Sequence, residues 1–468
     1  MTSQQWSLRL SERKLLLATV DLLLVNLGMA LALWIGAWRS LWEFDPDFLI
    51  GRIHWFFLGS VVYLFLAHAN DGYDSKVSAR HRDTLIMLLK TSLQMLLGYT
   101  VVYFFFPPTM LPRHVPFLFI AISLTLIAMW RAFYLRMLVG PSFRRRALVV
   151  GAGWAGQTIA KAAAEHLDGG YSFVGFIDDD PTKTGQVIEG MPVLGTRQEF
   201  PRIVQETGAS EIIVAITHNM HGELMKTILD CYQKGIQITP MPLLYELATG
   251  RVPVEHMGDH WFVTLPDNPE SGTFVYSGLK RLGDIVVSTI GLLIGSPILL
   301  TTALAVRLDS PGPIFYTQER MGKTGRVFPL IKFRTMIQEA EKDGRPRWAS
   351  YNDPRVTRLG RFLRHTRLDE LPQLVNVIKG EMSLVGPRPE RPHFVAQLET
   401  QIPFYRARLF VRPGITGWAQ INYSYGNSVE DALVKLQYDL YYIKHQSPYL
   451  DLFILFKTLG VMLTFKGT

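Results

Sequence analysis

Near its start the chain reads LLLATVDLLLVNLGMALALWIGAW from Leu15 to Trp38, with Asp21 as its one charged side chain. An apolar run of about 20 residues is long enough to cross the hydrocarbon core of a bilayer as a helix. Three more apolar segments follow: Ile53 to Ala67, which is shorter, Leu85 to Phe106, and Val115 to Val139. The sequence therefore predicts a four-helix transmembrane domain over residues 1–143.

Basic residues indicate how these segments are oriented. They lie before the first segment, between the second and third, and after the fourth: Arg9, Arg13, Lys14, Lys76, Arg80, Arg82, Arg144, Arg145 and Arg146. Because Lys and Arg concentrate in cytoplasmic loops, we expect both ends of the bundle in the cytoplasm. A charge within a membrane segment costs free energy unless it is paired. We therefore expect Asp21 to form a contact between helices rather than a transport site.

Composition narrows the class of protein further. The chain has 468 residues, is 48% hydrophobic and carries a formal net charge of +8. In a membrane protein that excess follows from the positive cytoplasmic loops and from attraction to anionic lipid headgroups. No nucleic-acid-binding motif accompanies it, so no nucleic-acid partner is expected. The single cysteine, Cys231, excludes an internal disulfide and a multi-cysteine metal site.

The pattern changes after the basic cluster at residues 144–146. Short buried strands at residues 147–150 and 173–177 alternate with amphipathic helical segments. This alternation predicts a small parallel α/β domain, Rossmann-like in character, over residues 144–245. The mixed, proline-containing stretch at 246–275 reads as a linker.

The first predicted strand of that domain ends in a glycine-rich turn. Gly151, Gly153 and Gly156 lie between a strand and a helix, as in the dinucleotide-binding fingerprint. Asp178, at the end of the second strand, lies where a ribose hydroxyl would be held. The domain is small and has no Tyr-x-x-x-Lys pair for redox chemistry. A structural or regulatory domain and a nucleotide-binding domain without chemistry both remain open.

A further apolar run extends from Ile285 to Val306 and is interrupted by Ser296-Pro297. Proline inside a helix removes a backbone donor and clashes with the preceding turn, so the helix must kink or break there. Basic residues flank the run on both sides. We expect a re-entrant membrane helix over about 283–308, with both ends on the cytoplasmic face. The alternative is an ordinary kinked spanning helix.

Two features next in the chain indicate phosphate chemistry. Arginines recur every third residue at Arg355, Arg358, Arg361, Arg364 and Arg367, which on a helix would form a basic ridge. Asp369-Glu370-Leu371-Pro372-Gln373 follows, and leads into a short apolar helix expected to end at Gly380. An isolated Asp-Glu pair at a helix start would be a cap. Here the arginines favour phosphate contacts, and adjacent carboxylates suit Mg²⁺.

More motifs complete the series: Lys332-Phe333-Arg334-Thr335-Met336 before the acidic pair, and Gly386-Pro387-Arg388-Pro389-Glu390, Pro413-Gly414-Ile415-Thr416-Gly417 and Tyr438-Asp439-Leu440-Tyr441-Tyr442 after it. In order and spacing, residues 280–468 resemble the bacterial sugar transferase family, the monotopic polyprenyl-phosphate phosphoglycosyl transferases. The resemblance covers about two-fifths of the chain. The N-terminal helices with the Rossmann-like domain resemble the long members of that family. Thr335 stands where many relatives carry serine.

The resemblance implies an α+β, membrane-associated catalytic domain over residues 276–468. It would transfer hexose-1-phosphate from a UDP-hexose to undecaprenyl phosphate and release UMP, at the cytoplasmic face of the bacterial inner membrane. Asp369 would be the nucleophile that carries the phosphosugar, and Glu370 would assist as a base. Both carboxylates would bind Mg²⁺. The remaining implied roles are substrate or phosphate contacts for Lys332, Arg364, Arg388 and Asp439, and the re-entrant bend for Ser296 and Pro297.

The resemblance also points to a pathway and to partners. Long members begin exopolysaccharide, capsule or O-antigen repeat units, with glucose as the first expectation for the sugar and galactose as the second. Membrane lipids are expected partners, and a homodimer through the N-terminal domains is plausible. Two alternatives stay open: a membrane-tethered nucleotide-sugar epimerase or dehydratase, and a non-catalytic scaffold for polysaccharide assembly.

Overall fold

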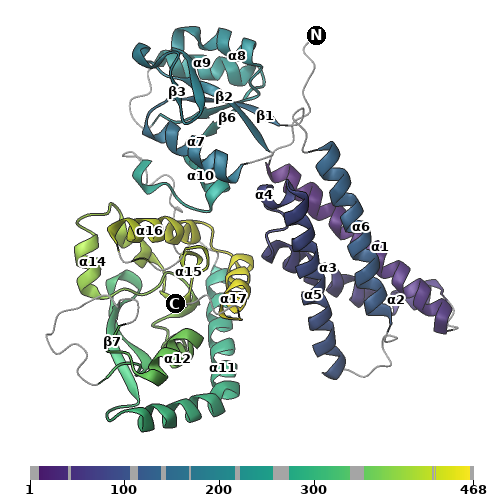
Figure 1. Ribbon diagram of the computed structural model, residues 1–468, viewed down its shortest axis with the longest axis vertical. Helices are drawn as coiled ribbons and strands as arrows, with labels where there is room; N and C mark the ends of the chain where they lie inside the picture. The colour runs from purple at the N-terminus through teal and green to yellow at the C-terminus, as the bar shows by residue number, and fades with distance from the viewer. Residues whose placement is uncertain are drawn as a thin grey trace. The chain divides into compact units, whose positions relative to one another are not determined.

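The computed structural model describes residues 10–40, 44–105, 114–138, 144–167, 170–216, 222–256, 274–337, 353–423, 426 and 428–463. It divides into two compact units, Met1–Thr249 and Gly250–Thr468. The first unit contains a helical bundle and an α/β domain, and the second contains one α+β domain (Figure 1).

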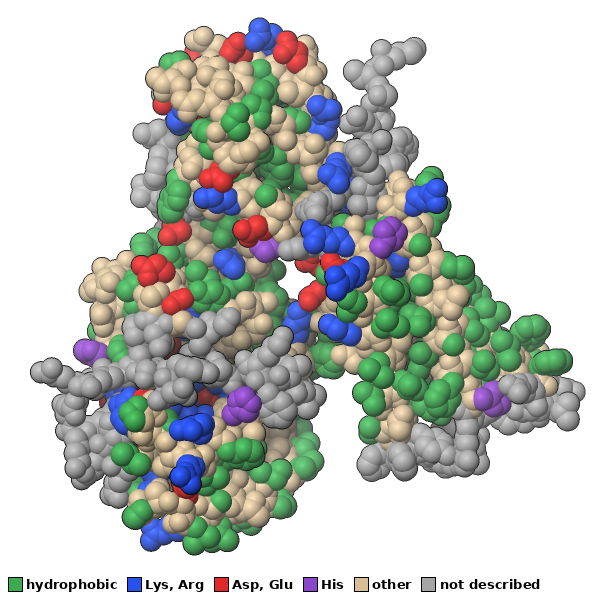
Figure 2. Space-filling view, in the orientation of Figure 1, with side chains coloured by type: hydrophobic (Ala, Val, Ile, Leu, Met, Phe, Trp, Pro, Cys, Tyr) green, Lys and Arg blue, Asp and Glu red, His purple; other side chains and the backbone are tan. Residues whose placement is uncertain are grey.

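The helical bundle is built from four long helices in the described part of the chain. Two short helices connect them; the bounds are α1 (Leu10–Ser40), α2 (Pro46–Ile50), α3 (Ile53–Ala69), α4 (Ser75–Ser78), α5 (His81–Phe105) and α6 (Val115–Met137). By length and composition α1, α5 and α6 can cross a membrane, whereas α3 is shorter, as the sequence predicts. Large apolar side chains such as Leu23, Phe57 and Leu97 are exposed on the outer surface, and Figure 2 shows hydrophobic side chains covering much of this bundle. Such a surface is typical of a protein embedded in lipid.

A buried ion pair joins two helices of the bundle. Arg131 of α6 lies 2.5 Å from the carboxylate of Asp21 in α1, and both side chains are almost completely buried. Arg131 also donates to the carbonyl oxygen of Gly72 at 2.9 Å. The predicted contact between helices at Asp21 is therefore confirmed, and the pairing offsets the cost of burying the charge.

The α/β domain contains a six-stranded sheet of order β3-β4-β2-β1-β5-β6, parallel except for β3. Its strands are β1 (Arg145–Val150), β2 (Tyr171–Ile177), β3 (Val187–Ile188), β4 (Met191–Gly195), β5 (Glu211–Val214) and β6 (Gln237–Pro240). Its helices are α7 (Trp154–His166), α8 (Phe200–Thr207), α9 (Gly222–Gln233) and α10 (Met241–Thr249). Successive residues of β1 point to opposite faces. Ala147 and Val149 pack with α7 and α10, and Leu148 and Val150 pack with α8 and α9.

The junction after this domain differs from the predicted linker. Helix α10 continues to Thr249, and the residues that follow pack into the second unit. Val252 and Val254 are buried in its hydrophobic core, and the Val252 amide donates to the carbonyl of Gln437 at 3.0 Å. The Val254 amide donates to the Val252 carbonyl at 2.9 Å, and Val254 begins the 3₁₀ helix η4 (Val254–His256). Of the predicted linker, residues 257–273 lie outside the described part.

The second unit begins with the long helix α11 (Phe274–Asp309). An antiparallel hairpin, β7 (Phe315–Met321) and β8 (Val327–Phe333), follows it. Strands β9 (Ser383–Val385) and β10 (Gly414–Thr416) form a short parallel pair. The remaining helices are α12 (Arg358–Thr366), α13 (Gln373–Lys379), α14 (Pro392–Leu398), α15 (Trp418–Asn422), α16 (Val429–Lys444) and α17 (Pro448–Leu463). Side chains of β8, α13, β9, α14, α16 and α17 form one hydrophobic core.

Helix α11 carries the predicted proline interruption without breaking. Pro297 lies inside the helix, and Figure 1 shows α11 turning sharply partway along its length. On its first arm Arg281 donates to the carbonyls of Val377 and Ile378 at 2.6 and 2.7 Å, which cap the end of α13. On its second arm Val306 is buried with side chains of β8 and α12. Because α11 bends, both arms pack against the same domain, and the apolar side chains between them, such as Ile294, stay exposed.

Candidate active site

The acidic pair lies in a short turn between two helices. Asp369 and Glu370 belong to the 3₁₀ turn η7 (Leu368–Glu370), just before α13. Arg367 adopts a left-handed conformation (φ 61°) that ends α12 and starts this turn. Gly380, also left-handed (φ 87°), ends α13 where the sequence predicts. Both carboxylates are buried, with 6% of Asp369 and 8% of Glu370 exposed.

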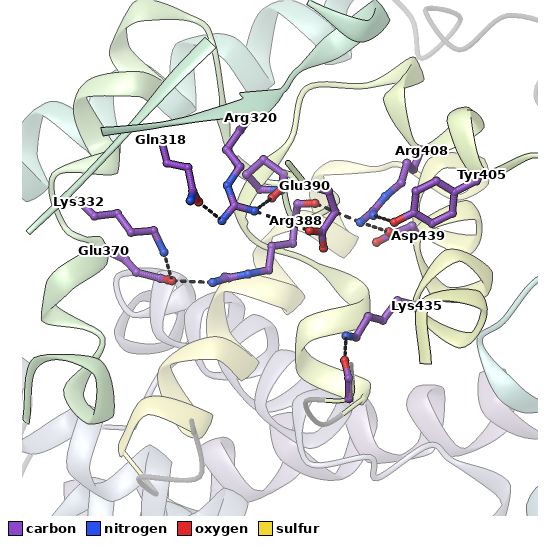
Figure 3. A network of polar contacts seen from close by, with 12 residues as sticks. Gln318, Arg320, Lys332, Glu370, Arg388, Glu390, Tyr405, Arg408, Lys435 and Asp439 are labelled. Carbon is purple, nitrogen blue, oxygen red and sulfur yellow. Dashed lines mark hydrogen bonds and ion pairs between the residues drawn. The ribbon is translucent and has the colours of Figure 1, made fainter. Parts of the chain in front are cut away.

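Cations from three separate elements surround Glu370. Its Oε1 lies 3.1 Å from Lys332 Nζ of β8 and 2.8 Å from Arg388 Nη2 (Figure 3). The same oxygen lies 3.6 Å from Arg367 Nη1. Burial by itself raises the pKa of Glu370, but these three cations outweigh it and hold that pKa well below its usual value. Glu370 is therefore ionised at neutral pH and paired with these cations.

Asp369 has a different environment although it is the neighbouring residue. Its Oδ1 is buried and has no hydrogen-bond partner among the described residues. Burial raises the pKa of Asp369, the charge of Glu370 raises it further, and Lys332, Arg364 and Arg367 oppose both effects. A buried carboxylate oxygen without a partner costs free energy. A phosphorus centre or a cation next to this oxygen would relieve that cost.

The predicted basic ridge is shorter in the structure. Only Arg358, Arg361 and Arg364 lie on α12, because the left-handed Arg367 terminates it. Arg355 precedes the helix and pairs with Asp353 at 2.5 Å. Arg364 Nε donates to the Thr335 hydroxyl at 2.9 Å. A serine hydroxyl at that position could accept the same hydrogen bond.

Asp439 lies deeper in the domain than the sequence suggests for a substrate contact. It is on α16, is 1% exposed, and its Oδ2 is 2.8 Å from Arg408 Nη2. Arg408 belongs to the 3₁₀ helix η8 (Tyr405–Phe410). Burial raises the pKa of Asp439 to about 6 although Arg408 opposes the shift. The structure therefore brings Lys332 and Arg388 to Glu370, and pairs Asp439 with Arg408 instead (Figure 3). Asp369 is the residue next to Glu370 in the same turn.

Residues of the α/β domain itself form the hydrogen bonds around its glycine-rich turn. Gly151 has a positive φ of 105°, and a Cβ at Gly156 would lie 2.0 Å from the carbonyl oxygen of Gly151. A Cβ at Gly153 would meet open space among the described residues. Asp178 Oδ2 accepts from the Ala152 amide at 2.7 Å, and its Oδ1 accepts from Lys183 Nζ at 3.1 Å. A ribose at Asp178 would have to displace these contacts.

Comparison with known proteins follows the same division of the chain. A bacterial sugar transferase family model matches residues 275–465, and a CoA-binding domain model matches residues 68–242. The chain is 34% identical over 363 residues to the UDP-glucose:undecaprenyl-phosphate glucose-1-phosphate transferase of Escherichia coli K12, over 73% of this chain and 76% of that relative. The chain belongs to the bacterial sugar transferase family.

Other members of the bacterial sugar transferase family match over shorter stretches. One is the UDP-N-acetylgalactosamine-undecaprenyl-phosphate N-acetylgalactosaminephosphotransferase of Aeromonas hydrophila, 41% identical over 53% of this chain and 57% of that relative. The chain thus spans little more than half of the Aeromonas protein. A putative undecaprenyl-phosphate N-acetylgalactosaminyl 1-phosphate transferase of Bacillus subtilis is 51% identical over 29% of this chain and 74% of that relative.

Sequence reasoning did not single out three charged residues that lie beside the site: Arg320, Glu390 and Arg408. Glu390 ends the motif at residues 386–390, where it has no assigned role, and Arg320 lies outside the motifs quoted above. Arg408 stands between Arg406 and Arg412, and only its burial (6% exposed) separates it from its neighbours. Burial of one arginine among several has no signal in a single sequence.

Proposed function

We propose that this chain transfers a hexose-1-phosphate from a UDP-sugar to undecaprenyl phosphate and releases UMP, as the first step of an exopolysaccharide, capsule or O-antigen repeat unit. Family membership and the reactions named for the relatives support this. One observation carries the proposal: within the described part of the chain the buried Oδ1 of Asp369 has no hydrogen-bond partner, while the adjacent Glu370 is held by cations. The arrangement leaves one carboxylate available to react.

In the first step the carboxylate of Asp369 attacks the phosphorus that carries the sugar. A bond forms between a carboxylate oxygen and that phosphorus, the bond to the bridging diphosphate oxygen breaks, and UMP leaves with the electron pair. In the second step a phosphate oxygen of undecaprenyl phosphate attacks the same phosphorus. The aspartyl bond breaks, the lipid diphosphate sugar forms, and Asp369 regains its carboxylate.

The cations around the pair lower the cost of this chemistry. Phosphoryl transfer is catalysed largely by positioning and by charges set in advance around the phosphate oxygens. Lys332, Arg364 and Arg388 come from β8, α12 and the loop after β9, so they surround the turn from several sides. We assign them to the phosphate groups of the donor.

A magnesium ion fits the chemistry of the two carboxylates. Magnesium commonly binds one or two carboxylates together with substrate phosphates. Among the described residues no group of three or more His, Cys, Asp or Glu side chains could hold a metal ion without such phosphates. Asp369, with its unpartnered oxygen, and Glu370 would hold the ion. Bound there, it would neutralise diphosphate charge and stabilise the leaving group.

The shape of α11 supports a re-entrant path through one leaflet. Both of its arms contact the same domain, and exposed apolar side chains gather near the bend, including Leu293, Ile294 and Leu300. We propose that this bend, set by Ser296 and Pro297, dips into the bacterial inner membrane from the cytoplasmic side. The active site would then stand at the membrane surface, where membrane lipids, undecaprenyl phosphate and cytoplasmic UDP-sugars meet.

The proposal is tested by measuring UMP release from the full chain in lipid nanodiscs. Undecaprenyl phosphate is supplied with UDP-glucose, UDP-galactose or UDP-N-acetylgalactosamine, which also tests glucose as the expected sugar. Asp369→Asn should abolish turnover and labelling of the protein by a phosphosugar. Asp431→Asn, which alters a cap of α16 in the same domain, should retain turnover. A fully active Asp369→Asn would favour a different nucleophile. Size measurement on the same sample tests the expected homodimer.

A further inference from the structure

Neighbouring elements hold the loop that carries Arg388 by hydrogen bonds to its backbone carbonyl oxygens. It joins β9 to α14 and contains Pro387 and Pro389 on either side of Arg388. All four consecutive carbonyl oxygens of residues 387 to 390 accept a hydrogen bond. In chain order the donors are the Gly414 amide (2.8 Å), Arg408 Nη2 (3.1 Å), Arg320 Nη1 (2.9 Å) and the Met321 amide (2.9 Å).

The two prolines and the four bonds together restrict the loop. Each proline fixes its own φ and lacks an amide hydrogen, so carbonyl oxygens are the groups through which neighbouring elements can hold residues 387 and 389. With these oxygens bound, the backbone at Arg388 has little freedom. The Arg388 guanidinium then donates to Glu370 Oε1 at 2.8 Å from a backbone position that the loop holds in place.

Two of the four donors are arginine side chains on opposite sides of the loop. Arg408 is 6% exposed and also donates to the Tyr405 hydroxyl at 2.7 Å. A buried guanidinium needs an anion nearby, and Asp439 supplies it at 2.8 Å. On the other side Arg320 contacts the Gln318 side chain at 2.6 Å and the Glu390 carboxylate at 3.6 Å (Figure 3).

We propose that Arg408 and Arg320 are positioning residues of the transferase, which hold Arg388 against Glu370 through the loop backbone. Asp439 belongs to the same device, because it fixes Arg408 rather than touching the substrate. This assignment differs from the substrate contact that the family resemblance implies for Asp439. It rests on the proposed function, since Arg388 is taken there to contact the donor phosphates.

The test is a double-mutant cycle between Arg388 and Arg408 in the full-length chain. kcat/KM for the UDP-sugar is measured by UMP release for Arg408→Gln, Arg388→Gln and the double variant. Loss of a supporting partner that orients a site residue typically costs about 10- to 100-fold, and we expect Arg408→Gln to fall in that range. Because Arg408 acts through Arg388, adding Arg408→Gln to Arg388→Gln should cause no further loss.

Arg406→Gln is the matched control. Arg406 lies on the same η8 helix, but its side chain is 63% exposed and pairs with Glu399 at 3.4 Å. Its kcat/KM should equal that of the wild type. Arg408→Lys should not rescue, since one ammonium lacks the planar fork that reaches Arg388, Tyr405 and Asp439 together. If Arg408→Gln fails to fold, Arg320→Gln takes its place in the cycle, because Arg320 is less buried.

Two outcomes would overturn the proposal: wild-type kcat/KM in a folded Arg408→Gln variant, or losses that multiply in the double variant. Hydrogen exchange in the segment 383–396 gives a readout that does not depend on turnover. Exchange there should quicken in Arg408→Gln and stay unchanged in Arg406→Gln. Full activity of Asp369→Asn would contradict the proposed function, whereas unchanged exchange in Arg408→Gln would contradict the positioning role alone.

Discussion

Gly156 and Gly153 provide a sharp test of what the glycine-rich turn does. Both belong to the dinucleotide fingerprint, but the structure separates them. A Cβ at residue 156 would lie 2.0 Å from the Gly151 carbonyl oxygen and 3.3 Å from a ring carbon of Phe176. At residue 153 the same atom would contact none of the described, non-adjacent residues within 4 Å. Gly156 is therefore required for packing of α7 on the sheet, and Gly153 is not.

The cost of Gly156→Ala follows from that contact. Overpacking a tight site costs about 1–3 kcal/mol, and a backbone atom at 2.0 Å cannot move aside as a flexible side chain would. We expect a loss of about 3 kcal/mol. Gly153→Ala replaces glycine by alanine at the N-cap of α7 and should cost less than about 1 kcal/mol.

Native-state hydrogen exchange of the purified full chain measures both effects locally. Protection of amides in α7 should fall about a hundredfold in Gly156→Ala and less than about tenfold in Gly153→Ala. UMP release, assayed where both variants stay folded, should be unchanged. Wild-type protection in Gly156→Ala, or equal losses in the two variants, would refute the packing argument. A selective loss of nucleotide binding in Gly153→Ala would favour a ligand at the turn.

Three further predictions concern the catalytic domain. Burial is the largest cause of the raised pKa of Asp369 and the charge of Glu370 is the second, and Glu370→Gln removes that charge. The acid limb of the pH profile of kcat/KM should therefore move to lower pH while its maximum falls. A move to higher pH would contradict this. Asp439 has a folded pKa of about 6, above the value of about 3.9 in an unfolded chain. The folded state thus holds its proton more tightly, so this group's contribution to stability is full below about pH 4 and is lost as the pH rises to about 6. Thermal unfolding from pH 4 to 7 should show that slope in the wild type and a flatter one in Asp439→Asn, and identical slopes would exclude it. Arg281→Gln removes two hydrogen bonds from a charged donor to the end of α13; we expect a loss of about 1–3 kcal/mol in the local stability of α13, measured by hydrogen exchange, against none at α16.

The apolar segments and the ordered motifs could be predicted because their signals are local. Length and hydrophobicity decide whether a helix can cross a bilayer, and alternation of strands and helices decides a parallel sheet. The pairing of each basic side chain with a particular carboxylate depends on contacts between distant parts of the chain. Lys332 and Glu370 are 38 residues apart in the chain, and their contact depends on how β8 packs beside the turn η7.

The arginine series shows why periodicity alone predicts too much. Spacing by three residues fits one face of a helix, and the sequence gives no sign that the helix stops before Arg367. Its left-handed backbone, at φ 61°, ends α12 and turns the chain toward Asp369. Non-glycine residues seldom adopt that conformation. Tertiary packing therefore outweighs the local preference at the residue that introduces the acidic turn.

Asp178 illustrates a different limit. An acid at the end of the second strand is the same signal whether it binds a ribose or its own backbone. In the structure its carboxylate accepts from the Ala152 amide and from Lys183, so the domain supplies the partners that a ligand would otherwise supply. The contacts of the Asp178 carboxylate in the folded domain separate the two cases.

The roles of Asp369 and Glu370 follow from this same dependence on partners. The two residues are adjacent and carry the same functional group, so residue type and position alone do not distinguish them, and only the family resemblance implied Asp369 as the nucleophile. Glu370 receives Lys332 and Arg388 at hydrogen-bond distance, and its pKa is held well below the usual value. Asp369 keeps a buried oxygen that no described residue contacts by a hydrogen bond, and its pKa is raised. Neighbouring carboxylates whose pKa values are driven apart take different roles. In the proposed mechanism Glu370 organises the cations and Asp369 attacks phosphorus, which is the assignment that Asp369→Asn tests.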